Sequence, residues 1–246
     1  MFKLSKVSFS YHDKKVISNF SYKFKDNTRY VIIGKSGCGK STLLNLLSGI
    51  NMPDKGEVTL NDQLIKDISH NVGITFQKNS LFPWLTLEEN YKLILDNLEE
   101  VKIIASKLDL EPYLDAYPNN LSGGQLQRAN ILKSLLISKD NLLFDEPTSS
   151  LDSFTKEMIN KYLLKVFSSY NSTSIFVTHD IEEALLLGQI IIVMNDGKII
   201  KEYKNKFYNK PDQKNKPTFY KEVIKLRSDI IWNILRVYYI VLLLGI

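Results

Sequence analysis

The stretch VIIGKSGCGKSTLLNLLSGI, residues 31–50, contains the residues that decide the fold. Residues 31–33 are apolar and typical of a short buried strand, and the leucines within 43–47 recur at helical spacing. Between them, residues 34–41 match the pattern G-x-x-x-x-G-K-S of a phosphate-binding loop. Glycine lets the backbone curl so that successive N–H groups point inward, and the start of the following helix adds a positive dipole end. This order of strand, loop and helix predicts a site for the phosphates of a nucleotide triphosphate.

Several positions of this loop have an expected task. Lys40 can reach the β- and γ-phosphates, and Ser41 supplies a hydroxyl for Mg²⁺. The thiol of Cys38 is expected to be reachable when the site is empty. The predicted nucleotide-binding residues of this segment are Gly34, Lys35, Ser36, Gly37, Cys38, Gly39, Lys40, Ser41 and Thr42.

The composition indicates an ordinary globular protein followed by a basic segment. With 246 residues, 44% of them hydrophobic, the chain can form one large α/β domain or a domain with a subdomain. Its single cysteine excludes an internal disulfide framework, and no apolar segment with basic flanks opens the chain, so we expect a cytosolic protein. Residues 201–227 hold nine Lys or Arg against three acids, so the net charge of +5 belongs to this segment. Nucleic-acid binding is therefore not expected.

A second buried strand ends in two acidic residues. The apolar run 142–144 is typical of a strand covered on both faces, Asp145 and Glu146 follow, and Pro147 ends the strand. Ligands of open α/β sheets lie at the carboxyl ends of the strands. Because adjacent strand residues point to opposite sides, we assign Asp145 to Mg²⁺ and Glu146 to polarising the attacking water. A merely solvated acidic pair is the alternative.

The stretch LSGGQLQR, residues 121–128, predicts a second anion site. Ser122 is a good N-cap, two glycines follow, and apolar residues then recur at helical spacing. The exposed amides of this helix start can bind an anion. Since a chain that holds one nucleotide has no need of two such sites, we expect two chains to pair head to tail, each Ser122 capping the phosphates held by the other chain. A capped helix after a glycine turn is the alternative.

The order of these motifs resembles that of ATP-binding cassette (ABC) transporter ATPases over residues 2–200. The LSGGQ element separates this family from other phosphate-loop enzymes. The resemblance implies an α/β fold, a phosphate-loop NTPase core with an antiparallel β subdomain and an α-helical insert, and it implies ATP and Mg²⁺ as cofactors. The matching segments are Gly34–Ser41, Leu121–Gln125, Leu142–Glu146, Ser150–Asp152 and Thr178–Asp180.

The resemblance also implies further site residues. Tyr11 would stack on adenine, Gln77 would contact Mg²⁺ or water and join the core to the insert, Asp152 would contact the second chain, and His179 would bind the γ-phosphate. Tyr11 could instead be a strand aromatic, and His179, which follows an apolar run, could be structural. The signature site of the family corresponds here to Ser122, Gly123, Gly124 and Gln125.

We expect an ABC ATPase domain over residues 1–205, with the helical insert at about 78–140, and then a basic and finally hydrophobic tail over 206–246. Large apolar residues open the insert at 82–84, where they suit a partner's protruding helix or pack the insert's own core. The last 17 residues, from Ile230, are short for a spanning helix and include a charge. They fit an interfacial anchor or permease contact, a helix packed on the core, or the remnant of a fused membrane segment.

The segment LFPWLT, residues 81–86, resembles the corresponding part of importer ATPases for nitrate, sulfonate, taurine and related ions. The predicted function is therefore the ATP-hydrolysing energy-coupling subunit of an ABC importer for a small solute. It would work as a homodimer, or paired with a related ATPase, on a separate integral membrane permease, at the cytoplasmic side of the membrane, with an extracytoplasmic solute-binding protein as an indirect partner. The alternative is a soluble ABC ATPase of DNA repair or translation, although the chain has neither a heptad coiled coil in its insert nor a second cassette.

Overall fold

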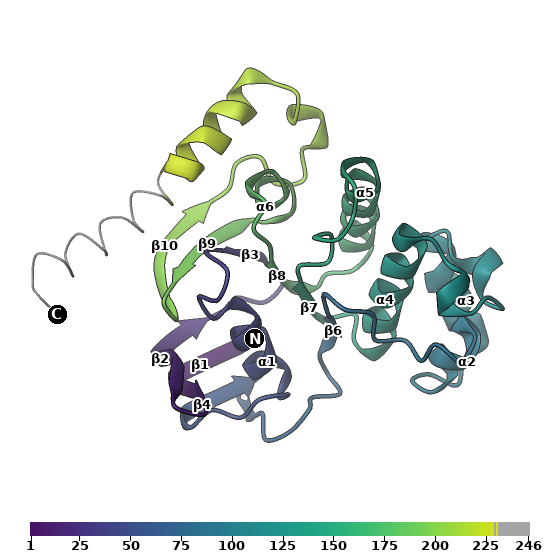
Figure 1. Ribbon diagram of the computed structural model, residues 1–246, viewed down its shortest axis with the longest axis horizontal. Coiled ribbons are helices and arrows are strands. Elements are labelled where there is room, and N and C mark those ends of the chain that lie inside the picture. The colour runs from purple at the N-terminus through teal and green to yellow at the C-terminus, as the bar shows by residue number, and fades with distance from the viewer. Residues whose placement is uncertain (229, 231–246) are drawn as a thin grey trace, which may run out of the picture.

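A six-stranded sheet forms the centre of the molecule in a computed structural model that describes residues 1–228 and 230 (Figure 1). Its strand order is β10-β9-β3-β8-β7-β6, and all neighbours are parallel except β10, which is antiparallel to β9. The strands are β3 (Arg29–Ile33), β6 (Gly73–Thr75), β7 (Asn141–Asp145), β8 (Thr173–Val177), β9 (Ile190–Asn195) and β10 (Lys198–Lys204).

An antiparallel sheet of four strands packs on one side of this core. Its order is β2-β1-β4-β5, and α1 contacts strands of both sheets. The prediction of an α/β core with an antiparallel β subdomain is thus confirmed. The elements are β1 (Phe2–Tyr11), β2 (Lys14–Lys23), α1 (Lys40–Ser48), β4 (Lys55–Leu60) and β5 (Gln63–Leu64).

Strand β3 shows why the central strands have continuous apolar sequences. Tyr30 and Ile32 are buried on the side of α1 and the antiparallel sheet. Val31 and Ile33 are buried on the opposite side, against the helices. Since successive side chains of a strand point to opposite faces, both faces are covered and no polar position remains between them.

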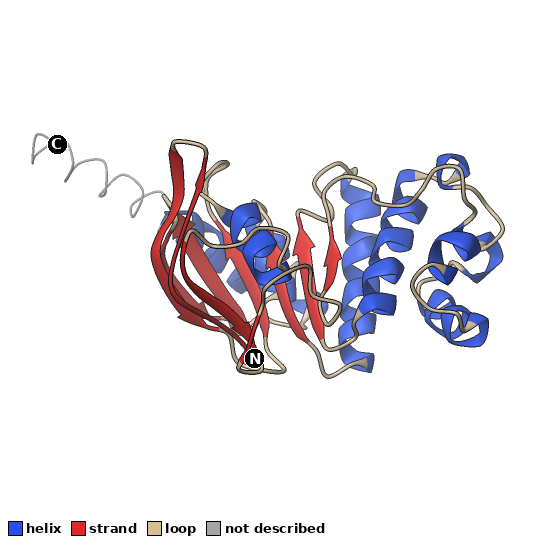
Figure 2. Ribbon diagram, turned by 90° about the horizontal axis from the view of Figure 1, so that it is seen from below, coloured by secondary structure: helices blue, strands red, loops and turns tan. Residues whose placement is uncertain are grey.

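The helical insert forms one end of the molecule and the antiparallel sheet lies toward the other (Figure 2). Thr86 begins α2 with a capping box, in which its side chain accepts from the Glu89 amide and the Glu89 carboxylate accepts from the Thr86 amide. Two helices of the core, α5 and α6, follow the insert and cover the central sheet. The helices are α2 (Leu87–Lys92), α3 (Leu98–Lys107), α4 (Gly123–Ile137), α5 (Ser153–Ser169) and α6 (Ile181–Leu187), and short 3₁₀ turns lie at Glu111–Tyr113, Pro118–Asn120 and Pro211–Gln213.

The chain continues to pack on the core after β10. Residues 217–228 are helical and lie beside α6 in Figure 1. The boundary at 205 stays a prediction, but side chains on both sides of it share one hydrophobic cluster. The buried ones beyond it are Phe207, Phe219, Val223 and Leu226.

The sequence left three alternatives for the segment that begins at Ile230. Of that segment the structure describes only Ile230, so none of the three is tested. Among the described residues, no helix has the length and apolar character needed to cross a bilayer.

Candidate functional site

The predicted site residues follow strands whose carboxyl ends meet at one edge of the central sheet. The strand registers pair Ile32 with Val177, Val177 with Asp145, and Phe144 with Thr75. The loops after β3, β8, β7 and β6 therefore leave the sheet at the same level. This arrangement brings the 34–41 loop together with the segments of Glu146, His179 and Gln77.

A close backbone contact at one position of the 34–41 loop, and a left-handed φ at another, favour glycine. A Cβ atom at Gly34 would lie 2.1 Å from the carbonyl oxygen of Met194 in β9. Gly37 has a φ of +77°, in the left-handed region that favours glycine. The loop can thus press against the sheet and turn its amides to the concave side, where an anion would bind.

Lys40 lies across the loop. Its Nζ donates to the carbonyl oxygens of Gly34 and Lys35, at 2.9 Å each, and the residue is only 5% exposed. The loop itself therefore holds the ammonium group in place, next to the amides of the anion site. Its contact with the β- and γ-phosphates stays a prediction.

Ser41 and Asp145 form the group that could hold Mg²⁺. The Ser41 hydroxyl donates to Asp145 Oδ1 at 2.9 Å. Burial raises the pKa of Asp145, as does the neighbouring Glu146, while the Ser41 hydrogen bond and the charge of Lys40 act in the opposite direction.

The donor types suit Mg²⁺, which prefers hard oxygen ligands and keeps several ligands from water and substrate phosphates. Within the described residues, no group of three or more His, Cys, Asp or Glu could hold a metal ion by itself. The fit therefore depends on a bound nucleotide for the remaining ligands.

Glu146 is held in a strained position at the end of β7. Its φ is +46°, which costs a non-glycine residue roughly 1–3 kcal/mol and is often found at functional sites. Its amide donates to the Val177 carbonyl at 2.9 Å, and its Oε2 lies 3.2 Å from His179 Nδ1. Since a carboxylate only accepts, Nδ1 carries the proton in this contact. The pair offers a proton acceptor and a fixed imidazole at the open edge.

Ser149, which no sequence motif indicated, joins Gln77 to Glu146. Gln77 Nε2 donates to Ser149 Oγ at 3.2 Å, and Ser149 Oγ donates to the carbonyl oxygen of Glu146 at 3.0 Å. The position of Ser149 three residues after Glu146, at the acidic end of β7, is the only sequence feature that points to this role. The roles of Gln77 at Mg²⁺ or water remain predictions.

The signature segment lies apart from the 34–41 loop of the same chain. Ser122 Oγ accepts from the Gln125 amide at 3.3 Å and the Ser122 amide donates to Gln125 Oε1 at 2.8 Å, which is a capping box. The first amides of α4, at Gly123 and Gly124, have no partner within the helix and remain free for an anion. Figure 1 shows β6 and β7 between α4 and α1.

Asp152 lies next to this segment. It caps α5 by accepting from the amides of Phe154 and Thr155, at 3.0 Å each. A Cβ atom at Gly124 would lie 2.8 Å from Thr155 Cγ2, so the starts of α4 and α5 are in close contact. The signature residues and Asp152 therefore lie on one surface, and their contact with a second chain stays a prediction.

Two further residues of the predicted site differ in exposure. Tyr11 is 44% exposed, and its hydroxyl accepts from Asn51 Nδ2 at 2.8 Å, so its ring is not buried in the sheet. Cys38 is buried, and burial raises the pKa of its thiol. The expectation of a reachable thiol is wrong, because the side chain turns into the core cluster while the loop presents its backbone to the ligand. Binding through the Cys38 backbone stays a prediction.

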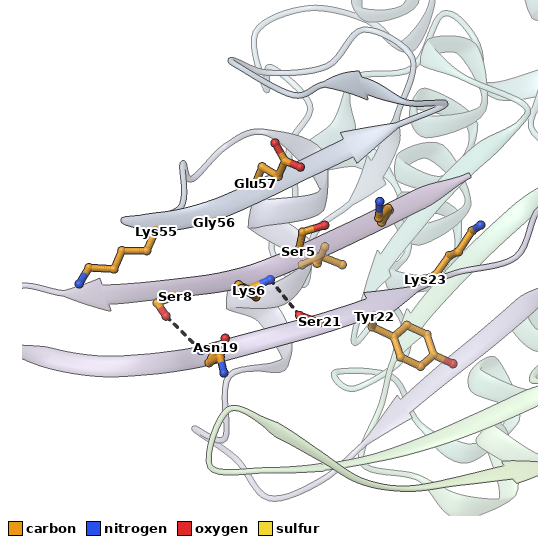
Figure 3. A pocket seen from close by; sticks show the side chains of 12 residues that line it. Ser5, Lys6, Ser8, Asn19, Ser21, Tyr22, Lys23, Lys55, Gly56 and Glu57 are labelled. Carbon is orange, nitrogen blue, oxygen red and sulfur yellow. Dashed lines mark hydrogen bonds between the residues drawn. The ribbon is translucent and has the colours of Figure 1, made fainter.

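A hollow of about 1060 Å³ lies away from this edge, on the exposed face of the antiparallel sheet (Figure 3). None of the motif residues lines it. Because phosphates are recognised by amides and charges on an open sheet edge, the size of a hollow does not locate this site. Its charged lining residues are Lys3, Lys6, Lys23, Lys55 and Glu57.

Comparisons with known proteins agree with this geometry. The ABC transporter family matches residues 17–149. The aliphatic sulfonates import ATP-binding protein of Bacillus cereus is 37% identical over 215 residues, which cover 83% of this chain and 84% of that protein. The Fe(3+) ions import ATP-binding protein of Fusobacterium nucleatum is 34% identical over 247 residues, covering 96% of this chain and 67% of that protein.

Solved structures give the same result. The dimeric structure of MJ0796, a bacterial ABC transporter cassette, has a TM-score of 0.73 and 31% identity, covering 83% of this chain and 98% of that one. A second dimeric structure of that cassette, in a post-hydrolysis state bound to ADP and Pi, has the same scores. The structure of cbiO1 from Clostridium perfringens, part of the ABC transporter complex cbiONQ, has a TM-score of 0.75 and 25% identity, covering 96% and 98%. From its motifs, its fold and these likenesses, the chain belongs to the ABC transporter family, as an ATP-binding subunit with ATPase activity.

Proposed function

We propose that this chain hydrolyses ATP to energise the import of a small organic or inorganic solute. It would pair with a second copy and bind a separate membrane permease at the cytoplasmic face of the membrane, while an extracytoplasmic solute-binding protein delivers the solute. The observation that supports the proposal is that Lys40, the hydrogen-bonded pair Ser41–Asp145 and the pair Glu146–His179 all lie at the same edge of the central sheet. The relatives named as import subunits favour this over a soluble ATPase of repair or translation.

In this mechanism the loop amides and Lys40 bind the phosphates, and Ser41 and Asp145 would hold the Mg²⁺ that accompanies them. When bound, Mg²⁺ neutralises charge on the β- and γ-phosphates. A water attacks the γ-phosphorus and the bond to the bridging oxygen breaks, which yields ADP and inorganic phosphate. Glu146 accepts the proton of the water, and His179 holds the Glu146 carboxylate through Nδ1. The imidazole is largely exposed, and in this mechanism it would face the γ-phosphate.

A dimer follows from the placement of the signature segment. Because Ser122 and Asp152 share a surface that is separate from the loop of their own chain, a second copy has to supply the signature to each nucleotide. The dimeric cassettes among the similar structures support this arrangement.

The variant Glu146→Gln tests the mechanism and the dimer together. It keeps the size of the side chain but removes the basic carboxylate, so hydrolysis should fall by at least about 100-fold. ATP binding should survive because Lys40, Ser41 and Asp145 are unchanged. In size-exclusion chromatography the variant should be a dimer with MgATP and a monomer without it.

The added substitution Ser122→Arg serves as the control, because its bulk lies where the partner's γ-phosphate would dock. It should abolish the dimer of Glu146→Gln. A Glu146→Gln protein that hydrolyses ATP at the parental rate, or stays monomeric at saturating ATP, would contradict the proposal.

The permease contact is proposed for the loop at the start of the insert. Trp84 is 68% exposed and Phe82 is 43% exposed, so neither belongs to the core of the insert. The buried Asn90 holds this loop: its Oδ1 accepts from the Phe82 amide at 2.7 Å, and its Nδ2 donates to three carbonyl oxygens, including that of Thr86 at 2.9 Å. A rigid loop with exposed aromatics suits a protruding helix of a partner.

Trp84→Ala should weaken co-purification with the permease from detergent-solubilised membranes and leave the melting temperature unchanged. Ile103→Ala is the matched control, since Ile103 is 59% exposed on α3, outside this loop. Equal recovery of the permease with both variants would contradict the assignment of the contact.

A further inference from the structure

One buried carboxylate joins the loops that carry Glu146 and His179. Glu183, on α6, is 3% exposed. Its Oε1 accepts from the hydroxyl of Thr148 at 2.6 Å, and its Oε2 accepts from the hydroxyl of Thr178. Both threonines are buried, at 2% and 4% exposure, so these hydrogen bonds are shielded from water.

The two threonines are close neighbours of the reacting pair in the chain. Thr148 comes two residues after Glu146, and Thr178 immediately precedes His179. Since consecutive Cα atoms are about 3.8 Å apart, a shift of either threonine moves the adjacent site residue with it. Through these threonines, Glu183 is linked to both partners of the 3.2 Å contact between Glu146 Oε2 and His179 Nδ1.

The backbone does not hold these loops together by itself. The parallel pairing of β7 and β8 ends where Asp145 pairs with Val177, and the Glu146 amide makes the next hydrogen bond, to the Val177 carbonyl. Beyond it, within residues 1–228, no backbone hydrogen bond joins the two loops. The Glu183 side chain connects them where the strand pairing has stopped.

Asp180 fixes the start of the helix that carries Glu183. Asp180 caps α6 by accepting from the amides of Glu182 and Glu183, and its Oδ2 forms an ion pair of 2.6 Å with Lys156 on α5. The Asp180 amide donates in turn to Thr178 Oγ1 at 3.1 Å. The carboxylate therefore has a defined position from which to orient both threonines.

We infer that Glu183 is a positioning residue for ATP hydrolysis: through Thr148 and Thr178 it sets the separation of Glu146 and His179. This inference rests on the proposed roles of Glu146 and His179. We call the two hydrogen bonds from Thr148 and Thr178 to the Glu183 carboxylate the Glu183 clamp. Because neither goes to the 34–41 loop, loss of the clamp should affect the chemical step and not the binding of ATP.

The variant Glu183→Gln tests the clamp. The amide keeps one acceptor oxygen but turns a donor toward the other threonine, so one hydroxyl loses its acceptor. Because a misplacement of about 1 Å can cost a factor of about 100, kcat should fall by at least about tenfold. KM and the dissociation constant for ATP should change by less than about twofold, as for an interaction that matters only in the transition state.

Glu182→Gln is the matched control, because Glu182 is the neighbouring glutamate of α6 and its carboxylate points to Lys214 at 3.8 Å. It should keep the parental kcat. Thr148→Val removes one hydroxyl at nearly constant volume and should lower kcat, whereas Thr148→Ser restores the hydroxyl and should recover it. This pair carries the test if Glu183→Gln does not fold.

A double-mutant cycle separates this inference from the proposed function. In the Glu146→Gln background, Glu183→Gln should cause no further loss of activity, because the carboxylate whose separation from His179 it sets is already absent. If Glu146→Gln alone lowers hydrolysis and Glu183→Gln does not, the clamp is refuted and the proposed function stands. If Glu146→Gln keeps the parental rate, the proposed function fails first. Equal losses from Glu183→Gln in both backgrounds, or a raised KM, would show a general structural role and overturn the inference.

Discussion

Gly34→Ala should separate the phosphate-binding loop from the sheet that supports it. In the structure, a Cβ atom at this position would lie 2.1 Å from the Met194 carbonyl oxygen, whereas real Cβ contacts essentially never fall below 3.0 Å. The obstacle is backbone of β9, which pairs with β3 and is buried, so it cannot turn aside as a flexible side chain could. The loop has to move by nearly 1 Å instead.

The magnitude follows from this overlap. Forcing extra atoms into a packed interior costs about 1–3 kcal/mol, and a collision with buried backbone should lie at or above the upper end. For a chain of this size, about 3 kcal/mol lowers the melting temperature by about 6–12 °C. Since the displaced loop includes the amides that face the phosphates, ATP affinity should fall by at least about tenfold, which corresponds to about 1.4 kcal/mol.

Circular dichroism would give the melting temperature without nucleotide, and isothermal titration calorimetry at a low temperature would give ATP affinity. Gly123→Ala is the control for stability, because a Cβ atom there has a single ordinary contact, 3.5 Å from Leu151 Cδ2. It should melt within about 2 °C of the parent, less than 1 kcal/mol for a chain of this length. A Gly34→Ala protein with parental melting and parental ATP affinity would refute the close approach of the loop to β9.

Three further outcomes are expected. Because burial raises the pKa of Asp145, this carboxylate should begin to take up a proton at a higher pH than an ordinary aspartate. Lowering the pH from 7 to about 5 should therefore weaken the Mg²⁺-dependent part of ATP affinity. Calorimetry should find a smaller loss in Asp145→Asn. The buried thiol of Cys38 should react slowly with a thiol reagent at equal rates with and without MgATP, so protection by nucleotide would contradict its burial. Phe219→Ala should lower stability by about 3–5 kcal/mol and the melting temperature by about 6–20 °C. Tyr220→Ala should change neither, because Tyr220 is 47% exposed. Equal melting temperatures for the two variants would show that the segment after residue 205 does not pack on the core.

Local sequence determined the strands and loops of the nucleotide site. Residues 30–33 of β3 and 142–144 of β7 are buried on both faces and are hydrophobic, and polar residues follow where the chain leaves the sheet. For this reason residues 31–41 and 142–146 identified both the strand ends and the groups that follow them. The N-cap Ser122 was also readable, because it occurs directly before a helical pattern and a cap depends on hydrogen bonds within three residues.

The tertiary structure decided everything that depends on contacts between distant parts of the chain. Sequence could not tell that Cys38 turns into the core, that Trp84 is exposed, or that Phe219 packs beside β-strands and helices formed much earlier in the chain. Nor could it show that Glu183 meets Thr148, 35 residues away. Hydrophobic patterns say that a side chain can be buried, but which surface covers it, and which polar groups it then has to satisfy, is set only when the folded layers come together.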